Sequence, residues 1–230
     1  MDEQIIIQNM DNLRRELLRH ARDPAHPPLL LPVTKTRSAA DILALQAAGV
    51  TQIGENRVQE IMQKYPALSG NFDIHLIGRL QTNKIKYIIE RVCMVQSLDS
   101  LRLAQALDAR AQAAGVRVPV LAEVNIGGEA QKTGISPEEA EAFVRYVSRL
   151  PGLHVRGLMT VMPNAADPET IRPLFRAMRS LYERLRSQAI DGVQIEELSM
   201  GMSGDFRIAA EEGATMVRIG SAIFGERVYP

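Results

Sequence analysis

Eight short apolar segments alternate with helical patterns along nearly the whole chain, at intervals of roughly 20 to 35 residues. They span residues 29–34, 51–54, 74–78, 92–98, 119–125, 155–161, 195–200 and 216–220. Strands joined by crossover helices form a parallel sheet, and eight such units in a chain of 230 residues close into a barrel. We therefore predict an α/β fold in which one (β/α)8 barrel, a TIM barrel, forms a single domain over residues 1–230. A doubly wound open sheet is the alternative, although no Gly-x-Gly-x-x-Gly turn follows the first segment.

The residues before the first strand are predicted to form an additional helix that packs on the barrel. Over residues 1–22 apolar side chains recur at the helical period, namely Ile6, Met10, Leu13 and Leu17. Asp23 and Pro24 then end the pattern. Later helices carry start signals of their own, because Ser38 and Ser136 resemble the first residues of capping boxes and Asp167 precedes a proline.

The composition narrows the classes of partner. Lys+Arg and Asp+Glu number 27 each, so the charge favours neither a nucleic acid nor an anionic membrane. No apolar stretch reaches the ~18 residues of a membrane span, and residues 1–22 lack the pattern of a secretory signal. Cys93 is the one cysteine, which allows no intrachain disulfide, and no histidine–carboxylate cluster indicates a metal. We expect a cytoplasmic protein.

Lys35 stands at the carboxyl end of the first strand, the end at which barrels of this type collect their working residues. The strand before it, LLLPVT, is predicted to be buried on both faces. Partial desolvation would leave more neutral amine, which can attack an aldehyde. A solvated lysine at a strand end is the alternative.

Arg218 lies in the last strand, where alternation directs Met216, Arg218 and Gly220 into the barrel. An arginine inside a barrel is costly unless something accepts its hydrogen bonds. One acceptor is a buried carboxylate such as Glu55 or Glu123. The other is an unprotonated ring nitrogen of a ligand.

Two turns rich in glycine and serine follow the last two strands. Gly220-Ser221 opens the final short helix, and Gly201-Met202-Ser203 precedes another helix. Loops at these two positions commonly bind phosphate in such barrels, although each turn alone is also a common helix cap. A lysine amine, an arginine donor and a phosphate site together predict a seat for pyridoxal 5'-phosphate (PLP).

The remaining polar candidates carry weaker signals. Asn56, at the end of the second strand, is placed to face the ring of such a ligand. His75 is either near the ring or a core histidine bonded to a backbone carbonyl. Lys84, Lys86 and Lys132 are predicted to be solvated unless they line the mouth of the cleft.

Longer motifs make the chain resemble a known family. VTKT, GENRVQE, IHLIGRLQTNK, EVNI with KTGI, RGLMTVMP, LSMGMSGD and MVRIGSAIFG follow one another between residues 29 and 227. They are similar to the motifs of the pyridoxal phosphate homeostasis proteins, whose bacterial members are called YggS-like and whose eukaryotic members are called proline synthetase co-transcribed homologues. These proteins in turn resemble the barrel half of alanine racemase.

The resemblance implies a role for each candidate residue. It assigns the Schiff base with PLP to Lys35 and the ring-nitrogen contact to Arg218, with Asn56 and His75 near the ring. It assigns the phosphate contacts to Ser199, Ser203, Gly220 and Ser221. Ile74 and Leu76 stand where aromatic residues are common in the family, a departure that affects the pocket wall alone.

The function that the resemblance implies is not catalytic: a protein that buffers or delivers PLP, without catalytic residues or a metal. Its partners would be PLP and the apo-forms of PLP-dependent enzymes, and we expect a monomer. A PLP-dependent amino-acid racemase is one alternative, and a barrel aldolase or isomerase of phosphorylated sugars is another. Racemisation needs a base on each face of the substrate carbon, and racemases take the second from a further domain that this sequence does not show. An arginine at the ring nitrogen also weakens the electron sink.

Overall fold

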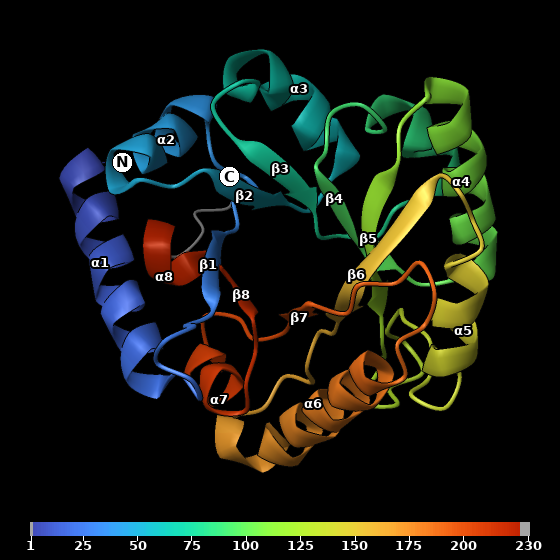
Figure 1. Cartoon of the computed structure of the whole chain (residues 1–230). Coiled ribbons are helices and arrows are strands. Elements are labelled where there is room, and N and C mark those ends of the chain that lie inside the picture. The colour runs from blue at the N-terminus through green and yellow to red at the C-terminus, as the bar shows by residue number, and fades with distance from the viewer. Residues whose placement is uncertain (1, 226–230) are drawn as a thin grey trace.

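Eight parallel strands form a single sheet that curls into a ring in the computed structural model, which describes residues 2–225 (Figure 1). The strands are β1 (Leu29–Pro32), β2 (Gln52–Glu55), β3 (Asp73–Leu76), β4 (Met94–Leu98), β5 (Val118–Glu123), β6 (Leu153–Met159), β7 (Glu197–Ser199) and β8 (Met216–Ile219). Their order is β1-β8-β7-β6-β5-β4-β3-β2, and a parallel bridge between Val33 and Gly54 links its two ends. The predicted barrel is therefore confirmed, and the doubly wound alternative is wrong.

Helices connect successive strands on the outside of the ring. The α-helices are α1 (Glu3–His20), α2 (Ala39–Leu43), α3 (Val58–Leu68), α4 (Leu101–Ala114), α5 (Ala140–Val147), α6 (Arg172–Ser187), α7 (Phe206–Glu211) and α8 (Ser221–Phe224). Three 3₁₀-helices are added to these, namely η1 (Ala44–Ala48), η2 (Thr82–Tyr87) and η3 (Pro168–Ile171). The connection from β3 to β4 is the short helix η2 in place of an α-helix.

The predicted helix starts show the expected caps. The hydroxyl of Ser38 accepts a hydrogen bond from the amide of Asp41 at 3.2 Å. Ser136 and Glu139 bond reciprocally, amide to side chain in both directions, just before α5. Asp167 accepts from the amide of Glu169, with proline at the first position of η3.

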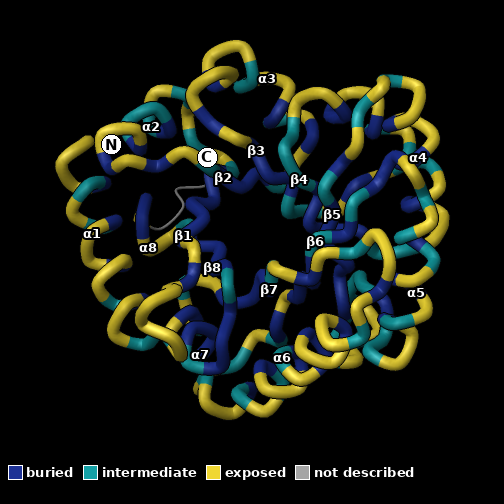
Figure 2. Tube along the Cα trace, viewed as in Figure 1, coloured by how far each residue is buried: buried dark blue, intermediate teal, exposed yellow. Residues whose placement is uncertain are grey.

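The buried side chains fall into two compartments, one on each face of the curled sheet. Figure 2 shows that buried residues lie mostly along the ring of strands, whereas exposed residues lie mostly on its outside. The larger is a contiguous apolar layer between strands and helices, which includes Val217 and Ile219 of β8. Five buried apolar residues lie outside that layer, namely Leu31, Val33, Leu121, Met159 and Met216. The inside of the barrel holds polar side chains as well, among them His75, Gln96, Ser199 and Arg218. This polar interior lies directly below the candidate site.

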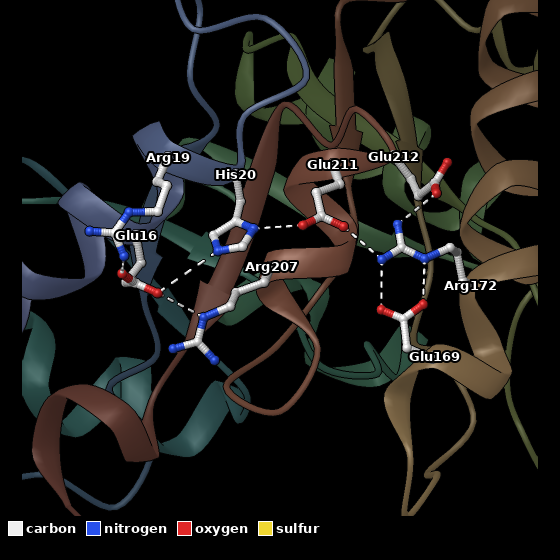
Figure 3. Close-up of polar contacts among 8 residues, drawn as sticks. All are labelled: Glu16, Arg19, His20, Glu169, Arg172, Arg207, Glu211 and Glu212. Carbon is white, nitrogen blue, oxygen red and sulfur yellow. Dashed lines mark hydrogen bonds and ion pairs between the residues drawn. The ribbon is translucent and has the colours of Figure 1, made fainter.

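Helix α1 packs against η1, α7 and α8 through the four apolar residues predicted from the sequence, each at most 7% exposed. Polar contacts add to this packing: Asn9 donates to the carbonyl of Ile223 at 2.9 Å. Figure 3 shows a network of charged residues that joins α1 to α7 and α6. In it, His20 contacts Glu211 at 2.6 Å, and Arg172 contacts the other oxygen of Glu211, also at 2.6 Å. Helix α1 therefore supports α7 and α8, the two helices that follow β7 and β8.

Within residues 2–225, no helix has the length and apolarity that a membrane crossing requires.

Candidate functional site

A pocket of about 410 Å³ opens where the strands end at their carboxyl termini. It brings together six of the residues predicted from the sequence: Lys35, Asn56, Ser203, Arg218, Gly220 and Ser221. They come from positions 35 to 221 of the chain, so only the closed barrel places them around one space. Two further predicted residues, His75 and Ser199, do not line this pocket and lie in the barrel interior below it.

Lys35 is half-buried on the pocket wall, directly after β1. The residue before it, Thr34, is fully buried and donates its hydroxyl to Glu55 at 2.7 Å. Lys64 of α3 bonds the same Glu55 oxygen at 2.6 Å and the carbonyl of Thr34 at 2.9 Å. A buried ion pair therefore fixes the backbone that precedes Lys35.

The residue after Lys35 is held by the same cluster. Thr36 has a φ of 65°, a left-handed conformation that non-glycine residues seldom adopt. Its amide donates to Glu60 at 2.6 Å, and Glu60 also binds Lys64 at 2.9 Å. The backbone on both sides of Lys35 is thus anchored to α3, which limits where the lysine side chain can reach. The sequence analysis did not identify this role of Lys64, because Glu55 and Thr34 lie 9 and 30 residues away from it along the chain.

Arg218 points into the barrel, as the alternation of β8 predicts, and is 4% exposed. Nη1 donates to the hydroxyl of Ser199 at 2.6 Å and Nη2 to the carbonyl of Thr160 at 2.8 Å. Among the described residues Arg218 forms no ion pair with Glu55 or Glu123. Glu55 pairs with Lys64 instead, and Glu123 accepts from Thr133 and attracts Arg218 only at longer range. Burial lowers the pKa of Arg218 to about 10, so the guanidinium is still charged at neutral pH.

The two turns after β7 and β8 face each other across the rim of the pocket. The hydroxyl of Ser203 accepts from the amide of Ala222 at 3.5 Å, which joins the turns directly. Gly201 has a φ of 94°, and a Cβ atom there would lie 2.4 Å from that of Ala209. Only glycine allows the first turn to pack this closely against α7. The result is a set of hydroxyl and backbone donors suited to an anion.

Asn56 lines the pocket beside Gly78, which follows β3, and the two backbones pack closely. A Cβ atom on Gly78 would lie 2.2 Å from the carbonyl oxygen of Asn56. His75, by contrast, hydrogen-bonds the side chains of Gln52 at 3.2 Å and Gln96 at 3.0 Å. It is a core histidine whose partners are side chains, whereas the alternative weighed from the sequence was a backbone carbonyl.

Glu123 lines the pocket and was not among the predicted site residues. It is 6% exposed and accepts from Thr133 at 2.6 Å. Burial raises the pKa of Glu123, an effect that the Thr133 hydrogen bond partly offsets. Gly134, with a φ of 114°, lets this loop lie against Asn125. The KTGI motif, which contains Thr133, was the signal that could have led to Glu123.

Lys84, Lys86 and Lys132 do not line the pocket. Lys132 donates to the carbonyl of Met162 at 3.0 Å and pairs with Glu129. Among the residues described, no group of three or more histidine, cysteine or acidic side chains could hold a metal ion.

Comparison with known proteins shows to which family the chain belongs. The chain is 45% identical over 201 residues to the pyridoxal phosphate homeostasis protein of Aquifex aeolicus, with 87% of each chain covered. It is 37% identical over 230 residues to the protein of that name from Pasteurella multocida, covering 99% of this chain and 98% of that one. The chain belongs to the pyridoxal phosphate homeostasis protein family. Residues 4–228 also match the model of the alanine racemase N-terminal domain.

Solved structures of this family and of racemases share the barrel. PipY of Synechococcus elongatus with PLP bound superposes with a TM-score of 0.83 at 32% identity, covering 96% of this chain and all of that one. Alanine racemase of Clostridium difficile superposes with a TM-score of 0.74 at 16% identity, a likeness of fold alone. The chain covers 57% of that racemase. The resemblance inferred from the motifs is confirmed.

Proposed function

We propose that this member of the pyridoxal phosphate homeostasis protein family binds PLP in the pocket at the carboxyl ends of the strands and buffers or delivers it, without turning over amino acids. The observation that carries the proposal is the convergence of Lys35, Arg218 and two donor-rich turns on one space of about 410 Å³. Family relatives bear the name of this function, and PipY has been solved with PLP bound.

The residues present match the functional groups of PLP. When bound, the cofactor supplies an aldehyde that condenses with an amine, and Lys35 would provide that amine as a Schiff base. Ser203, Gly220 and Ser221 would hold the phosphate through hydroxyl and backbone donors. Asn56 would lie beside the ring.

Arg218 would donate a hydrogen bond to the pyridine nitrogen. Its two hydrogen bonds to Ser199 and Thr160 use two of the five N–H groups of a guanidinium. Because its pKa stays near 10, Arg218 remains a donor, and the nitrogen that faces it must accept and stay unprotonated. An unprotonated pyridine is a poorer electron sink, which favours carrying the cofactor over racemisation.

Ser199 and His75 receive a different role from the one that the resemblance implied. The hydroxyl of Ser199 is fully buried between Arg218 and Gln96, and the ring of His75 is 3% exposed. We propose that both act behind the pocket, through Arg218, rather than on the phosphate or the ring.

We further propose that the protein works as a monomer in the cytoplasm and that apo-forms of PLP-dependent enzymes receive its cofactor. Lys35, Arg218 and the two turns, which are the groups proposed to hold PLP, all come from this chain. Burial raises the pKa of the Cys93 thiol to about 12, which makes this cysteine unreactive at neutral pH.

Reductive trapping tests the cofactor site. The protein is incubated with PLP, reduced with borohydride, digested and mapped by mass spectrometry. We expect the adduct on Lys35 and its loss in Lys35→Ala, whereas the matched control Lys132→Ala, outside the pocket, keeps it. An adduct wholly on Lys84, Lys86 or Lys132 would refute the assignment.

Turnover is tested separately. The PLP-loaded protein is incubated with L-alanine, and chiral chromatography follows the D-isomer. We expect the absorption spectrum to change without production of D-alanine, and we expect an apo-enzyme mixed with the loaded protein to regain activity. Formation of D-alanine at ~1 per second or more, an ordinary enzymatic rate, would replace the carrier function with that of a racemase.

A further inference from the structure

A chain of hydrogen bonds runs across the inside of the barrel from Arg218 to the opposite end. Arg218 Nη1 donates to Ser199 Oγ at 2.6 Å, and Ser199 Oγ donates to Gln96 Oε1 at 2.8 Å. Gln96 Nε2 lies 3.0 Å from His75 Nδ1, and His75 Nε2 lies 3.2 Å from Gln52 Oε1. The first four side chains belong to residues at most 4% exposed, and the five residues come from β8, β7, β4, β3 and β2.

The cation at one end and the orientation of the Gln96 amide together set the direction of the bonds in this chain. A guanidinium only donates, so Ser199 accepts from it, and Ser199 gives its own hydrogen to the carbonyl oxygen of Gln96, whose amide nitrogen faces His75. The amide nitrogen of Gln96 then donates to Nδ1 of His75. That nitrogen carries no hydrogen as a result, and His75 is the neutral tautomer with its hydrogen on Nε2, donated to Gln52.

Two details of the surroundings fit this arrangement. Gln96 Nε2 also lies 3.1 Å from the sulfur of Met216, which gives its second hydrogen an acceptor. Burial lowers the pKa of His75 to about 4, and no charged group contributes to that shift among the described residues. The histidine is therefore neutral at physiological pH, as the direction of the chain requires.

We propose that Gln96, oriented by His75, is a positioning residue for Arg218 and thereby for the hydrogen bond that Arg218 offers to the cofactor ring. Gln96 holds the Ser199 hydroxyl turned away from the guanidinium, so that its lone pairs face Arg218. Together with the carbonyl of Thr160, this fixes the plane of the guanidinium. The inference rests on the proposed PLP site.

The test compares two substitutions of Gln96. In Gln96→Glu, one carboxylate oxygen still accepts from Ser199, but the other, when ionised, can only accept from His75. The histidine must then carry a hydrogen on Nδ1, and ¹⁵N NMR of the side chain should show a neutral Nε2–H tautomer in the native protein and a protonated Nδ1 in Gln96→Glu at pH 7. This readout needs no cofactor, and a merely structural role for Gln96 would not produce it.

Gln96→Leu removes the acceptor for Ser199. We expect PLP to bind roughly tenfold more weakly, about the loss of one hydrogen bond to a charged group, with a shifted absorption maximum and a smaller loss in Gln96→Glu. Val95→Ala is the matched control, because Val95 lies on the same strand but faces the helices. It should lower the thermal stability and leave the spectrum and the state of His75 unchanged.

The outcomes separate the inference from the proposed function. A native His75 whose Nδ1 carries a hydrogen would overturn the direction of the chain, even if Gln96→Leu fails to fold. Native affinity and spectrum in a folded Gln96→Leu would overturn the positioning role while PLP binding stands. Failure of the native protein to bind PLP would overturn the proposed function and, with it, the role toward the ring.

Discussion

Replacing Lys64 by methionine tests whether the ion-pair cluster beside Lys35 stabilises the fold. The Lys64 ammonium lies 2.6 Å from Glu55 and 2.9 Å from Glu60, and its side chain is 11% exposed. Methionine keeps most of the length and volume and removes the charge. The carboxylate of Glu55, whose side chain is fully buried, loses its cation.

The magnitude follows from burial and distance. Unit charges 2.6 Å apart attract by about 6 kcal/mol at an effective dielectric constant of ~20. Desolvation offsets part of this attraction, and removing one partner of a buried pair costs about 3–5 kcal/mol. We expect a loss of that size at pH 8, which is a large fraction of the about 5–15 kcal/mol that stabilise an ordinary domain.

The loss should depend on pH with a definite sign. Burial raises the pKa of Glu55 above its ordinary 4.5, and Lys64 opposes that rise, so Lys64→Met raises the pKa further. Folded Glu55 then binds a proton that the unfolded chain releases, and stability falls as pH rises through this window. Lys64→Met should therefore lose less stability at pH 5 than at pH 8.

Urea denaturation followed by circular dichroism, at both pH values, measures these differences. The double variant Lys64→Met/Glu55→Gln, which removes the buried charge, should recover much of the stability and lose the pH dependence. A loss below about 1 kcal/mol, typical of an exposed pair, would refute the reasoning, as would equal losses at pH 5 and pH 8.

Three further predictions concern the turns and the surface network. Ser221→Asp should weaken PLP binding in equilibrium dialysis far more than Ser221→Ala, because the new charge repels the phosphate; equal affinities would place the phosphate elsewhere. Gly201→Ala should destabilise the protein by about 2–4 kcal/mol in urea denaturation, from left-handed strain and from overlap with Ala209; a loss under 1 kcal/mol would contradict this. Hydrogen bonds from Arg172 hold the pKa of Glu169 below its ordinary 4.5, so their contribution is present above that pH and fades in acid. Arg172→Ala should therefore lose stability at pH 7 and less at pH 3, and an equal loss at both would count against it.

The local patterns of the sequence predicted the fold because a barrel of this kind repeats one local unit. Each strand appears as an apolar run and each crossover as a helical stripe, and strand order follows from chain order. The caps at Ser38, Ser136 and Asp167 are likewise local, since donor and acceptor lie two or three residues apart. The helix expected between β3 and β4 is a 3₁₀-helix, a distinction that periodicity over six residues does not make.

Some residues of the candidate site could be predicted from the sequence. They are the ones whose position along a strand decides which way the side chain faces. Lys35, Asn56 and Ser221 follow strand ends, and Arg218 alternates inward. Ser199 also ends a strand, yet the structure turns it into the interior, toward Gln96. Which inward residues reach the pocket depends on the depth at which each strand enters the barrel.

The sequence by itself determined the number and order of the strands, the inward direction of Arg218 and the family, because each depends on local periodicity or on motif order. Only the tertiary structure decided which polar groups satisfy one another. Gln96 meets Ser199 across 103 residues, and Lys64 meets the Thr34 carbonyl across 30. Such contacts form because the barrel closes and because buried polar groups must find hydrogen-bond partners. No local sequence pattern predicts them.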